Sequence, residues 1–375
     1  MLDEISYEEV YQAYRKLKSF AYYDSNDLFL KSKISEFETK LEFAADDDLS
    51  FESINFERKL QNLHRALIGN LEQRRRNTYW NNLLKEVSFK LVPKSIKEEE
   101  ELSDERLSNI FSNSREQRKY EIDKVVAFID APLQLYLVSI LWIMKQGHFH
   151  EHGFDSYCYG NRLTIDKRGP RVIDQELYND ERLFKPYFKQ YQKWRDEGIS
   201  TARSLLDSNQ DALFLSFDIK DFYYSVRLKK ESFSALAIND YPYLTNLMER
   251  LHQTYTEIIV ETEYPGKYEI KEDEMILPIG LPSSYVLANH YLSRLDSSIR
   301  KLINPVYYSR YVDDMFLVIS NPKFRKGKLQ EYVTSILERI ALLDEANETF
   351  RLRDYPELCF QQSKTLVYHF NHKAS

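Results

Sequence analysis

Hydrophobic residues recur at two different spacings along the chain. Over the first 110 residues, apolar positions return every three or four residues, as on one face of a helix, for example in residues 7–17 and 60–71. From about residue 206 onward, short runs of β-branched and aromatic residues predict strands, and helical periodicity returns between them. The pattern therefore predicts an α+β protein with an N-terminal helical region.

Two changes of pattern divide the chain into three regions: 1–110, 111–205 and 206–375. The charged stretch 94–103 predicts a break after the helical region. In the middle region, residues 122–128 predict a strand and residues 132–144 a buried helix.

A helix rich in aromatic residues closes the middle region. Its aromatic residues are Phe184, Tyr187, Phe188, Tyr191 and Trp194, and its basic residues are Lys185, Lys189 and Lys193. One interpretation is that the aromatic face packs in the core while the cationic face meets water. The alternative is a helix whose basic residues follow a nucleic-acid strand.

Two adjacent acids, Asp313 and Asp314, lie between two runs of strand composition, residues 305–310 and 315–319. The pattern predicts a β-hairpin with two carboxylates at its tip. A polar turn of this kind is often no more than a solvated loop. A third acid changes the picture, because Asp218 follows the apolar run 213–217, which also predicts a strand.

A strand end and a hairpin tip that face each other can gather these three carboxylates. Carboxylate oxygens are the ligands that Mg²⁺ prefers, and Mg²⁺ is commonly shared with substrate phosphates. Two such ions can activate an attacking hydroxyl and stabilise a leaving oxygen in phosphoryl transfer. The arrangement therefore predicts a site for two Mg²⁺ ions.

The order of these motifs resembles that of reverse transcriptases. Asp218 with Tyr223 is similar to polymerase motif A, and Tyr311-Val312-Asp313-Asp314 is similar to motif C. Between them, Gly280-Leu281-Pro282-Ser283-Ser284 with Asn289 resembles motif B. Retroviral and group II intron enzymes carry Gln where this chain has Ser283. The Ser form looks more like bacterial defence-associated (abortive-infection and unknown-group) reverse transcriptases.

The resemblance implies a right-hand polymerase with fingers in 111–205 and a palm in 206–375. It implies Asp218, Asp313 and Asp314 as catalytic residues. These three and the backbone of Ile219 would be the metal ligands. The implied substrate-binding residues are Tyr223, Ser283, Asn289, Lys364 in a segment similar to motif D, and Arg162 in a segment similar to a finger motif, with Lys119 and Lys124 as weaker candidates.

Two of these positions have a local explanation. A ring at Tyr223 would leave no room for a 2′-hydroxyl, which favours deoxynucleotides. Ser283 or Ser284 is a good N-cap for the helix predicted after it, which Asn304-Pro305 ends. Asn289 either reaches substrate or bonds a neighbouring backbone group.

The function that the resemblance implies is nucleotidyl transfer from dNTPs, with an RNA template or non-coding RNA and a DNA product as partners. It further implies a role in antiphage defence by abortive infection, synthesis that is template-independent or protein-primed, and homo-oligomers. An RNA-templated reverse transcriptase of retron or group II intron type is the alternative, and a catalytically silent nucleic-acid scaffold is a third. A thumb or C-terminal helical domain is not evident after the palm.

Composition places limits on the class of protein. A net charge of −7 does not favour nucleic-acid binding in bulk, but basic residues cluster in 74–76, 115–124 and 185–195. No run reaches the 18 apolar residues that a membrane helix needs. Two cysteines exclude a disulfide framework, and a cytoplasmic location is expected.

Overall fold

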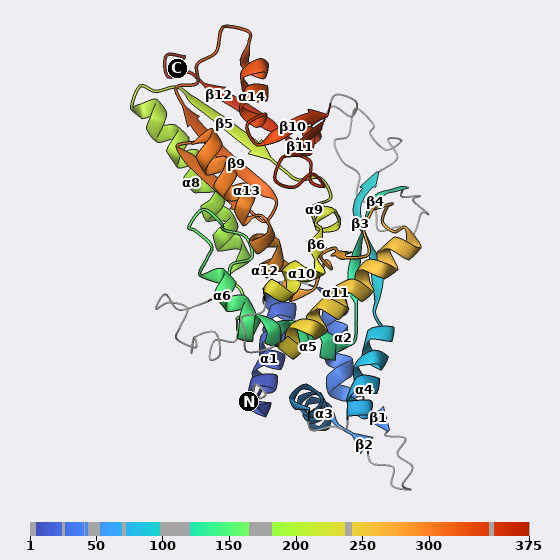
Figure 1. The fold of residues 1–375 in the computed structure, drawn as a ribbon. Helices are drawn as coiled ribbons and strands as arrows, with labels where there is room; N and C mark the ends of the chain where they lie inside the picture. Colours follow the sequence, from blue (N-terminus) through green and yellow to red (C-terminus); the bar gives the residue numbers. More distant parts are fainter. Residues whose placement is uncertain are drawn as a thin grey trace, which may run out of the picture.

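The computed structural model describes residues 5–24, 27–40, 42–43, 53–69, 73–97, 121–164, 182–236, 242–344 and 349–374. Within them, a helical region lies at one end of the molecule and a sheet at the other, and a long hairpin and α11 lie between them (Figure 1). No helix of this described part is long and apolar enough to cross a membrane.

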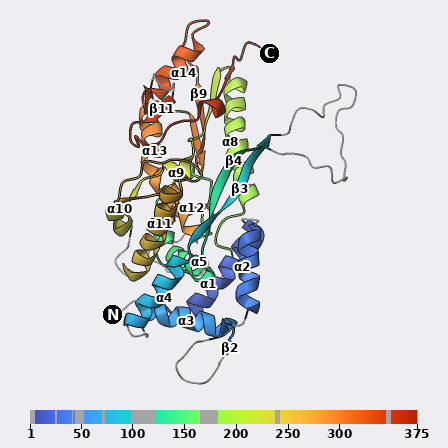
Figure 2. The same cartoon turned by 90° about the vertical axis from the view of Figure 1, so that its right-hand side faces the viewer.

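Four helices form the N-terminal region, as the periodicity predicts. They are α1 (Tyr7–Ser19), α2 (Leu28–Thr39), α3 (Phe56–Ile68) and α4 (Gln73–Lys85), with the short strands β1 (Glu42–Phe43) and β2 (Ser53–Ile54) and the π-helical turn η1 (Phe20–Asp24). A capping box starts α1, because Ser6 and Glu9 each bond the other's backbone N–H. Figure 2 shows these helices together below the hairpin.

The middle of the chain starts with an antiparallel hairpin of β3 (Ser88–Lys97) and β4 (Glu121–Asp130). The predicted break at 94–103 is therefore wrong in its first residues, since β3 continues through Lys97. Because β3 and β4 pair with each other, the hairpin crosses the region boundary near residue 110. Then follow α5 (Leu133–Trp142), η3 (Ile143–Gly147), α6 (His148–Glu151) and α8 (Tyr187–Asp207).

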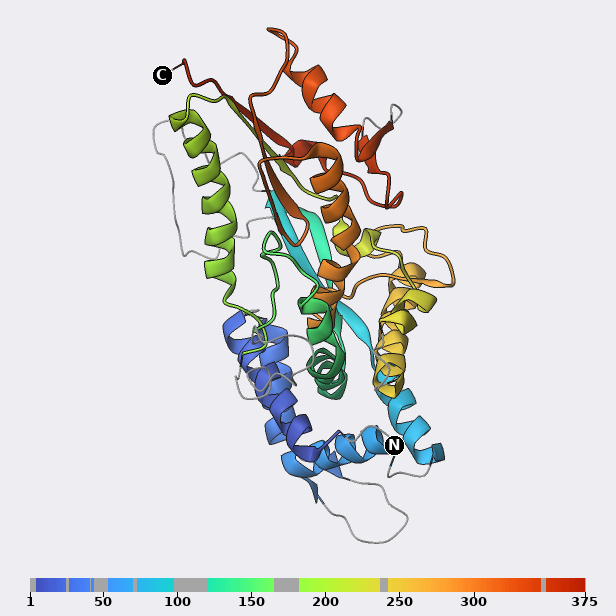
Figure 3. The ribbon, with the colours of Figure 1, turned by 60° about the vertical axis from the view of Figure 1, so that its left-hand side comes forward.

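A four-stranded antiparallel sheet forms the last region, in the order β12-β5-β9-β8. Its strands are β5 (Ala212–Phe217), β8 (Tyr307–Tyr311), β9 (Asp314–Ser320) and β12 (Leu366–Phe370). The strands predicted around both groups of acids are thus confirmed. Helix α8 lies along the sheet (Figure 3), and Tyr307 of β8 contacts Trp194 of this helix.

The remaining elements connect or cover these parts. They are α9 (Phe222–Ser225), β6 (Leu228–Lys229), α10 (Lys230–Ala235), α11 (Pro242–Thr262), β7 (Glu274–Met275), α12 (Pro282–Tyr291), α13 (Ser293–Ser298), η4 (Ile299–Ile303), α14 (Leu329–Leu337), β10 (Ala341–Asp344), β11 (Thr349–Leu352) and η5 (Gln362–Lys364). Strand β6 pairs with β7, and β10 pairs with β11.

The helix predicted after the motif similar to motif B is present, but its start differs from the prediction. Leu281 is the N-cap residue and Pro282 the first helical residue, so neither Ser283 nor Ser284 caps the helix. Both serines are fully buried inside the first turn. The predicted end is confirmed, because Asn304 takes a left-handed conformation with φ 54° after η4.

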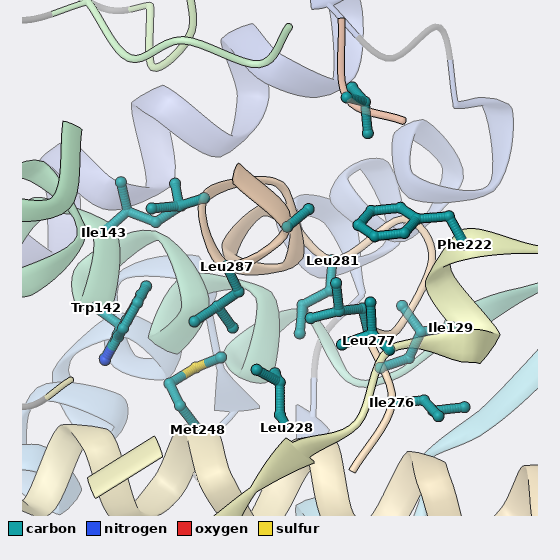
Figure 4. Close-up of a cluster of buried hydrophobic side chains, with 14 of the residues drawn as sticks. Ile129, Trp142, Ile143, Phe222, Leu228, Met248, Ile276, Leu277, Leu281 and Leu287 are labelled. Atoms are coloured by element: carbon teal, nitrogen blue, oxygen red, sulfur yellow. The ribbon is translucent and has the colours of Figure 1, made fainter. Parts of the chain in front are cut away.

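One cluster of buried apolar side chains runs from Ile5 in the first region to Phe360 in the last. Figure 4 shows part of it, where Trp142 of the α5 end, Met248 of α11 and Leu287 of α12 lie near one another. The three predicted regions therefore share one hydrophobic core. Helix α12 packs in this core as well.

Candidate active site

The tip of the β8–β9 hairpin is a two-residue loop, Val312-Asp313, because Tyr311 pairs with Asp314. Val312 has a φ of 57°. Positive φ at the first loop residue suits the twist of a tight hairpin, but a β-branched side chain rarely adopts it. Such a conformation costs about 1–3 kcal/mol and persists only where surrounding contacts impose it.

A buried network imposes the conformation of this loop. Arg310 is fully buried and donates to the carbonyl oxygen of Val312 at 2.8 Å and to Oδ1 of Asn289 at 3.0 Å. The same guanidinium forms two bonds to Asp296 of α13, at 2.7 and 2.8 Å. These contacts connect the β8–β9 hairpin to α12 and α13. The Arg310 charge is compensated by a bidentate carboxylate.

Gly160 supports the loop from the other side. A Cβ at this position would lie 2.6 Å from the backbone N of Val312, closer than real Cβ contacts come. The carbonyl oxygen of Gly160 accepts a hydrogen bond from the side-chain amide of Asn289 at 2.8 Å. The finger segment, α12 and the hairpin tip therefore meet at Val312.

The three predicted carboxylates lie together. Phe217 pairs with Met315, so Asp218 at the end of β5 lies opposite Asp314 at the start of β9. Burial first, and then the charges of Asp314 and Asp218, raise the pKa of Asp313 to about 7. Burial and the charge of Asp218 likewise raise the pKa of Asp314, to about 6. A cation bound near these carboxylates would reduce the repulsion between them.

Lys364 supplies one positive charge at this site. Its Nζ lies 2.9 Å from Oδ2 of Asp218. The side chain is 47% exposed, so the lysine reaches in from the rim of the site. The hydrogen bond and charge of Asp218 raise the pKa of Lys364 although partial burial opposes this. Lys364 therefore stays protonated at neutral pH.

A cavity of about 330 Å³ opens in front of the acids. Asp218, Ile219, Tyr223, Asp313 and Lys364 line one side. The β3–β4 hairpin lines the other with Lys94, Asp123, Lys124, Val125 and Val126. Two lysines of the hairpin thus share a cavity of small-molecule size with Asp218 and Asp313.

Tyr223 lies where the prediction needs it, but the backbone there is not extended. Asp221 adopts a left-handed conformation with φ 47° and starts the short helix α9. The chain therefore leaves the extended conformation of β5 before it reaches Tyr223. Tyr223 still lines the cavity, with its ring 6.5 Å from that of Tyr285 and nearly perpendicular to it.

Three predicted substrate-binding residues are used inside the fold instead. Ser283 is fully buried, and its N–H donates to Oγ of Ser139 in α5. Asn289 is fully buried in the Arg310 network described above. The Arg162 guanidinium pairs with buried Glu151 and with three backbone carbonyls. None of the three lines the cavity, and their substrate contacts stay predictions.

Sequence reasoning missed several residues that line the cavity: Lys94, Asp123, Tyr268 and Gln361. Lys94 and Asp123 could be found only by knowing that β3 and β4 pair. Lys124, one of the two weaker candidates, does line the cavity. Lys119, the other, lies outside the described residues.

The donor set fits Mg²⁺ in its chemistry. Asp218, Asp313 and Asp314 offer hard oxygen ligands, and burial together with the neighbouring carboxylates raises the pKa of Asp313 and of Asp314, a cost that a bound cation would offset. In the described residues, no three His, Cys, Asp or Glu side chains are already arranged around one metal position. Mg²⁺ is usually bound by one or two carboxylates, and water and substrate phosphates complete its coordination.

Comparison with known families decides what kind of domain surrounds the site. Residues 163–343 match the family described as reverse transcriptase (RNA-dependent DNA polymerase). These residues form a reverse transcriptase domain. No curated protein matches the sequence. The reverse transcriptase domain contains the three carboxylates, Tyr223, Ser283 and Asn289, whereas Lys364 follows it and Arg162 immediately precedes it.

The match supports a polymerase that transfers nucleotides, with nucleotide substrates and a nucleic-acid template. It also supports a palm and fingers, and the mixture of helix and strand agrees with an α+β fold. Members of this family generally use divalent ions, usually Mg²⁺, which is the ion that the carboxylates suit.

Proposed function

We propose that the protein is a reverse transcriptase-like DNA polymerase that incorporates dNTPs with two Mg²⁺ ions. The observation that carries this proposal is one cavity lined by Asp218, Asp313 and three lysines, with Asp314 next to Asp313 at the start of β9. One of these lysines, Lys364, bonds Asp218. A hydroxyl oxygen forms a bond to the α-phosphorus of the dNTP. The bond from that phosphorus to the oxygen bridging to the β-phosphate breaks, and pyrophosphate leaves.

Each side chain has a distinct task in this reaction. The three carboxylates would hold the ions together with substrate phosphates, joined by the backbone carbonyl of Ile219. When bound there, Mg²⁺ supplies activation of the attacking hydroxyl and stabilisation of the leaving oxygen. Lys364 is protonated and can give a proton or its charge to departing pyrophosphate. In-line attack needs little else beyond positioning.

The lysines across the cavity suit the triphosphate. Lys94 and Lys124 project from neighbouring strands of one hairpin, and both line the cavity. A triphosphate carries several negative charges, and the ammonium groups of these two lysines would attract them into the cavity. Tyr223 would lie under the sugar and exclude a 2′-hydroxyl, which makes deoxynucleotides the preferred substrates.

The finer assignment is to the defence-associated enzymes, with synthesis that is template-independent or protein-primed and serves abortive infection. It rests on Ser283, where templated relatives carry Gln. The Ser283 side chain is buried and does not line the cavity, which supports a site that does not use this position to place a templated nucleotide. The second candidate, an RNA-templated enzyme of retron or group II type, keeps the same metal site.

One experiment separates these functions. Purified protein is incubated with Mg²⁺ and each labelled dNTP in turn, with and without added RNA, beside an Asp313→Asn variant that keeps the side-chain shape. Products are run on a denaturing protein gel. Label that migrates with the protein without RNA, and is lost in the variant and with EDTA, supports protein-primed, untemplated synthesis.

Label found only in free nucleic acid, and only when RNA is present, would favour the templated alternative. Incorporation by Asp313→Asn equal to that of the parent would refute the metal-site assignment. No incorporation by the parent under any of these conditions would favour the scaffold.

A further inference from the structure

The first half of α8 exposes three aromatic side chains to solvent. Tyr187 is 56% exposed, Phe188 59% and Tyr191 36%. The interpretation that this aromatic face packs in the core is right only for Phe184 and Trp194, which are buried. Three large rings within five residues of one exposed helix face form a surface that core packing does not explain.

Two of these rings touch the β8–β9 hairpin. Tyr187 and Tyr191 are stacked, with ring centroids 5.8 Å apart. Both meet the ring of Tyr311 edge-on, at 5.7 and 5.5 Å. Tyr311 lies two residues before Asp313 in the hairpin, so the surface begins where the chemistry takes place. Tyr311 also packs on buried Trp194 of the same helix, with ring centroids 5.8 Å apart.

The same stretch of α8 carries exposed basic side chains. Lys189, Lys193 and Arg195 are all exposed. Lys193 lies 3.5 Å from Glu197, and Arg195 lies 2.9 Å from Asp196. Exposed pairs of this kind contribute little free energy, so a polyanion can compete for both cations. Between residues 184 and 195 the helix carries no acidic residue.

We propose that this aromatic and basic surface of α8, formed by Tyr187, Phe188, Tyr191, Lys189, Lys193 and Arg195, binds a single nucleic-acid strand next to the active site. The strand's bases stack on the exposed rings, and its phosphates pair with the flanking cations. Stacking accepts any base, because each has a π face, so the surface binds without sequence preference. The inference rests on the proposed polymerase function and adds the place where the strand runs.

The positive charge of the surface favours a nucleic-acid strand over a protein partner. A protein partner with an apolar patch would bury the rings, but it would also desolvate three cations without supplying a regular row of anions. A nucleic-acid strand supplies a phosphate at each nucleotide beside each stackable base. The contact of Tyr187 and Tyr191 with Tyr311 also favours a nucleic-acid strand, because a strand whose end reacts at Asp313 must pass close to Tyr311.

The test measures binding apart from chemistry. Fluorescence anisotropy follows a labelled oligo-dT strand titrated with the full chain and its variants. Tyr187→Ala, Phe188→Ala and Tyr191→Ala are each expected to weaken binding about five- to tenfold, as loss of one stacked base does. Tyr368→Ala is the matched control, because it removes a ring of similar exposure, 48%, from β12 instead. It is expected to leave affinity unchanged.

The charged part of the surface has its own readout. Lys189→Ala and Lys193→Ala should each lower the salt dependence of binding by about 0.7 in the logarithmic slope. Unchanged affinity in all three aromatic variants, with native circular dichroism, would overturn the proposal. Altered sedimentation of the protein alone, without an effect on oligonucleotide affinity, would overturn it too and make the surface an interface between copies.

Failure of this inference is distinguishable from failure of the proposed function. Asp313→Asn should bind oligo-dT as the parent does while incorporating no nucleotide. Should that variant still incorporate, the metal site is wrong and the strand surface stands. Should the aromatic variants bind normally while Asp313→Asn is inactive, the polymerase stands and the strand runs elsewhere.

Discussion

The guanidinium of Arg310 donates a hydrogen bond to the carbonyl oxygen of Val312, at 2.8 Å, immediately before the acid at the hairpin tip. Val312 is held at a φ of 57°, which its β-branched side chain disfavours. The bond therefore stabilises a strained loop residue directly before Asp313. Arg310 can do this only because Asp296 compensates its buried charge.

Asp296→Asn should be strongly destabilising. The substitution leaves the fully buried Arg310 cation without its bidentate partner, which costs about 3–5 kcal/mol of unfolding free energy. Urea unfolding followed by tryptophan fluorescence measures the loss. Asp155→Asn is the matched control, because its partner Arg300 is about half exposed, and about 0–1 kcal/mol is expected. Equal losses of unfolding free energy in the two variants would contradict the prediction that the buried pair contributes more than the exposed pair.

Gly160→Ala should impair catalysis more than stability. The added Cβ would meet the backbone of Val312 at 2.6 Å, so the hairpin tip must shift and carry Asp313 with it. A shift of about 1 Å can cost about 100-fold in rate. Primer-extension rates and thermal unfolding are measured together. Gly153→Ala serves as the control, since its Cβ meets nothing closer than 3.4 Å. Full activity in Gly160→Ala would mean that the tip tolerates displacement.

The carboxylates could be predicted from the sequence because their signals are local. Asp218 directly follows an apolar run, and Asp313 and Asp314 lie between two such runs, so strand ends alone place them. Pairing of β5 with β9 then brings the acids together, as the prediction required.

The roles of the other residues depend on partners that are distant in the sequence. Asn289 meets Gly160 across 129 positions, and Arg162 meets a glutamate buried in a different element. From the sequence alone, a polar residue in a motif suggests substrate contact, whereas its hydrogen bonds to distant parts of the chain become visible only in the structure. Lys94 reaches the cavity only because β3 pairs with β4 across a long connection, which no periodicity reveals.

Lys364→Met should slow nucleotide incorporation by about 100-fold, as loss of a positioned acid does. Stability should change by no more than about 1 kcal/mol, because the pair with Asp218 is about half exposed on the lysine side. Single-turnover incorporation and urea unfolding report the two effects. Lys267→Met is the control, a lysine paired with Glu263 on the surface. A loss of stability without a loss of rate would assign Lys364 a structural role.

His252 should make the protein sensitive to acid. The imidazole is fully buried in α11, its Nδ1 bonds the carbonyl of Met248 at 2.8 Å, and burial lowers its pKa to about 4. In the unfolded chain a histidine titrates near about 6.5. The contribution to stability is therefore complete above pH 6.5 and is lost as the pH falls from about 6.5 toward 4, because only the unfolded chain takes up the proton.

The lowered pKa of His252 corresponds to about 3 kcal/mol of unfolding free energy once the unfolded chain is fully protonated. His150 adds an effect of the same sign, since burial first and His290 second lower its pKa to about 4 as well. Unfolding free energy measured by urea at a series of pH values from 7.5 to about 4.5 should fall in the parent. It should fall less steeply in His252→Phe, whose ring keeps the contact with Phe233. Parallel curves for the two proteins would show that His252 does not titrate differently on folding.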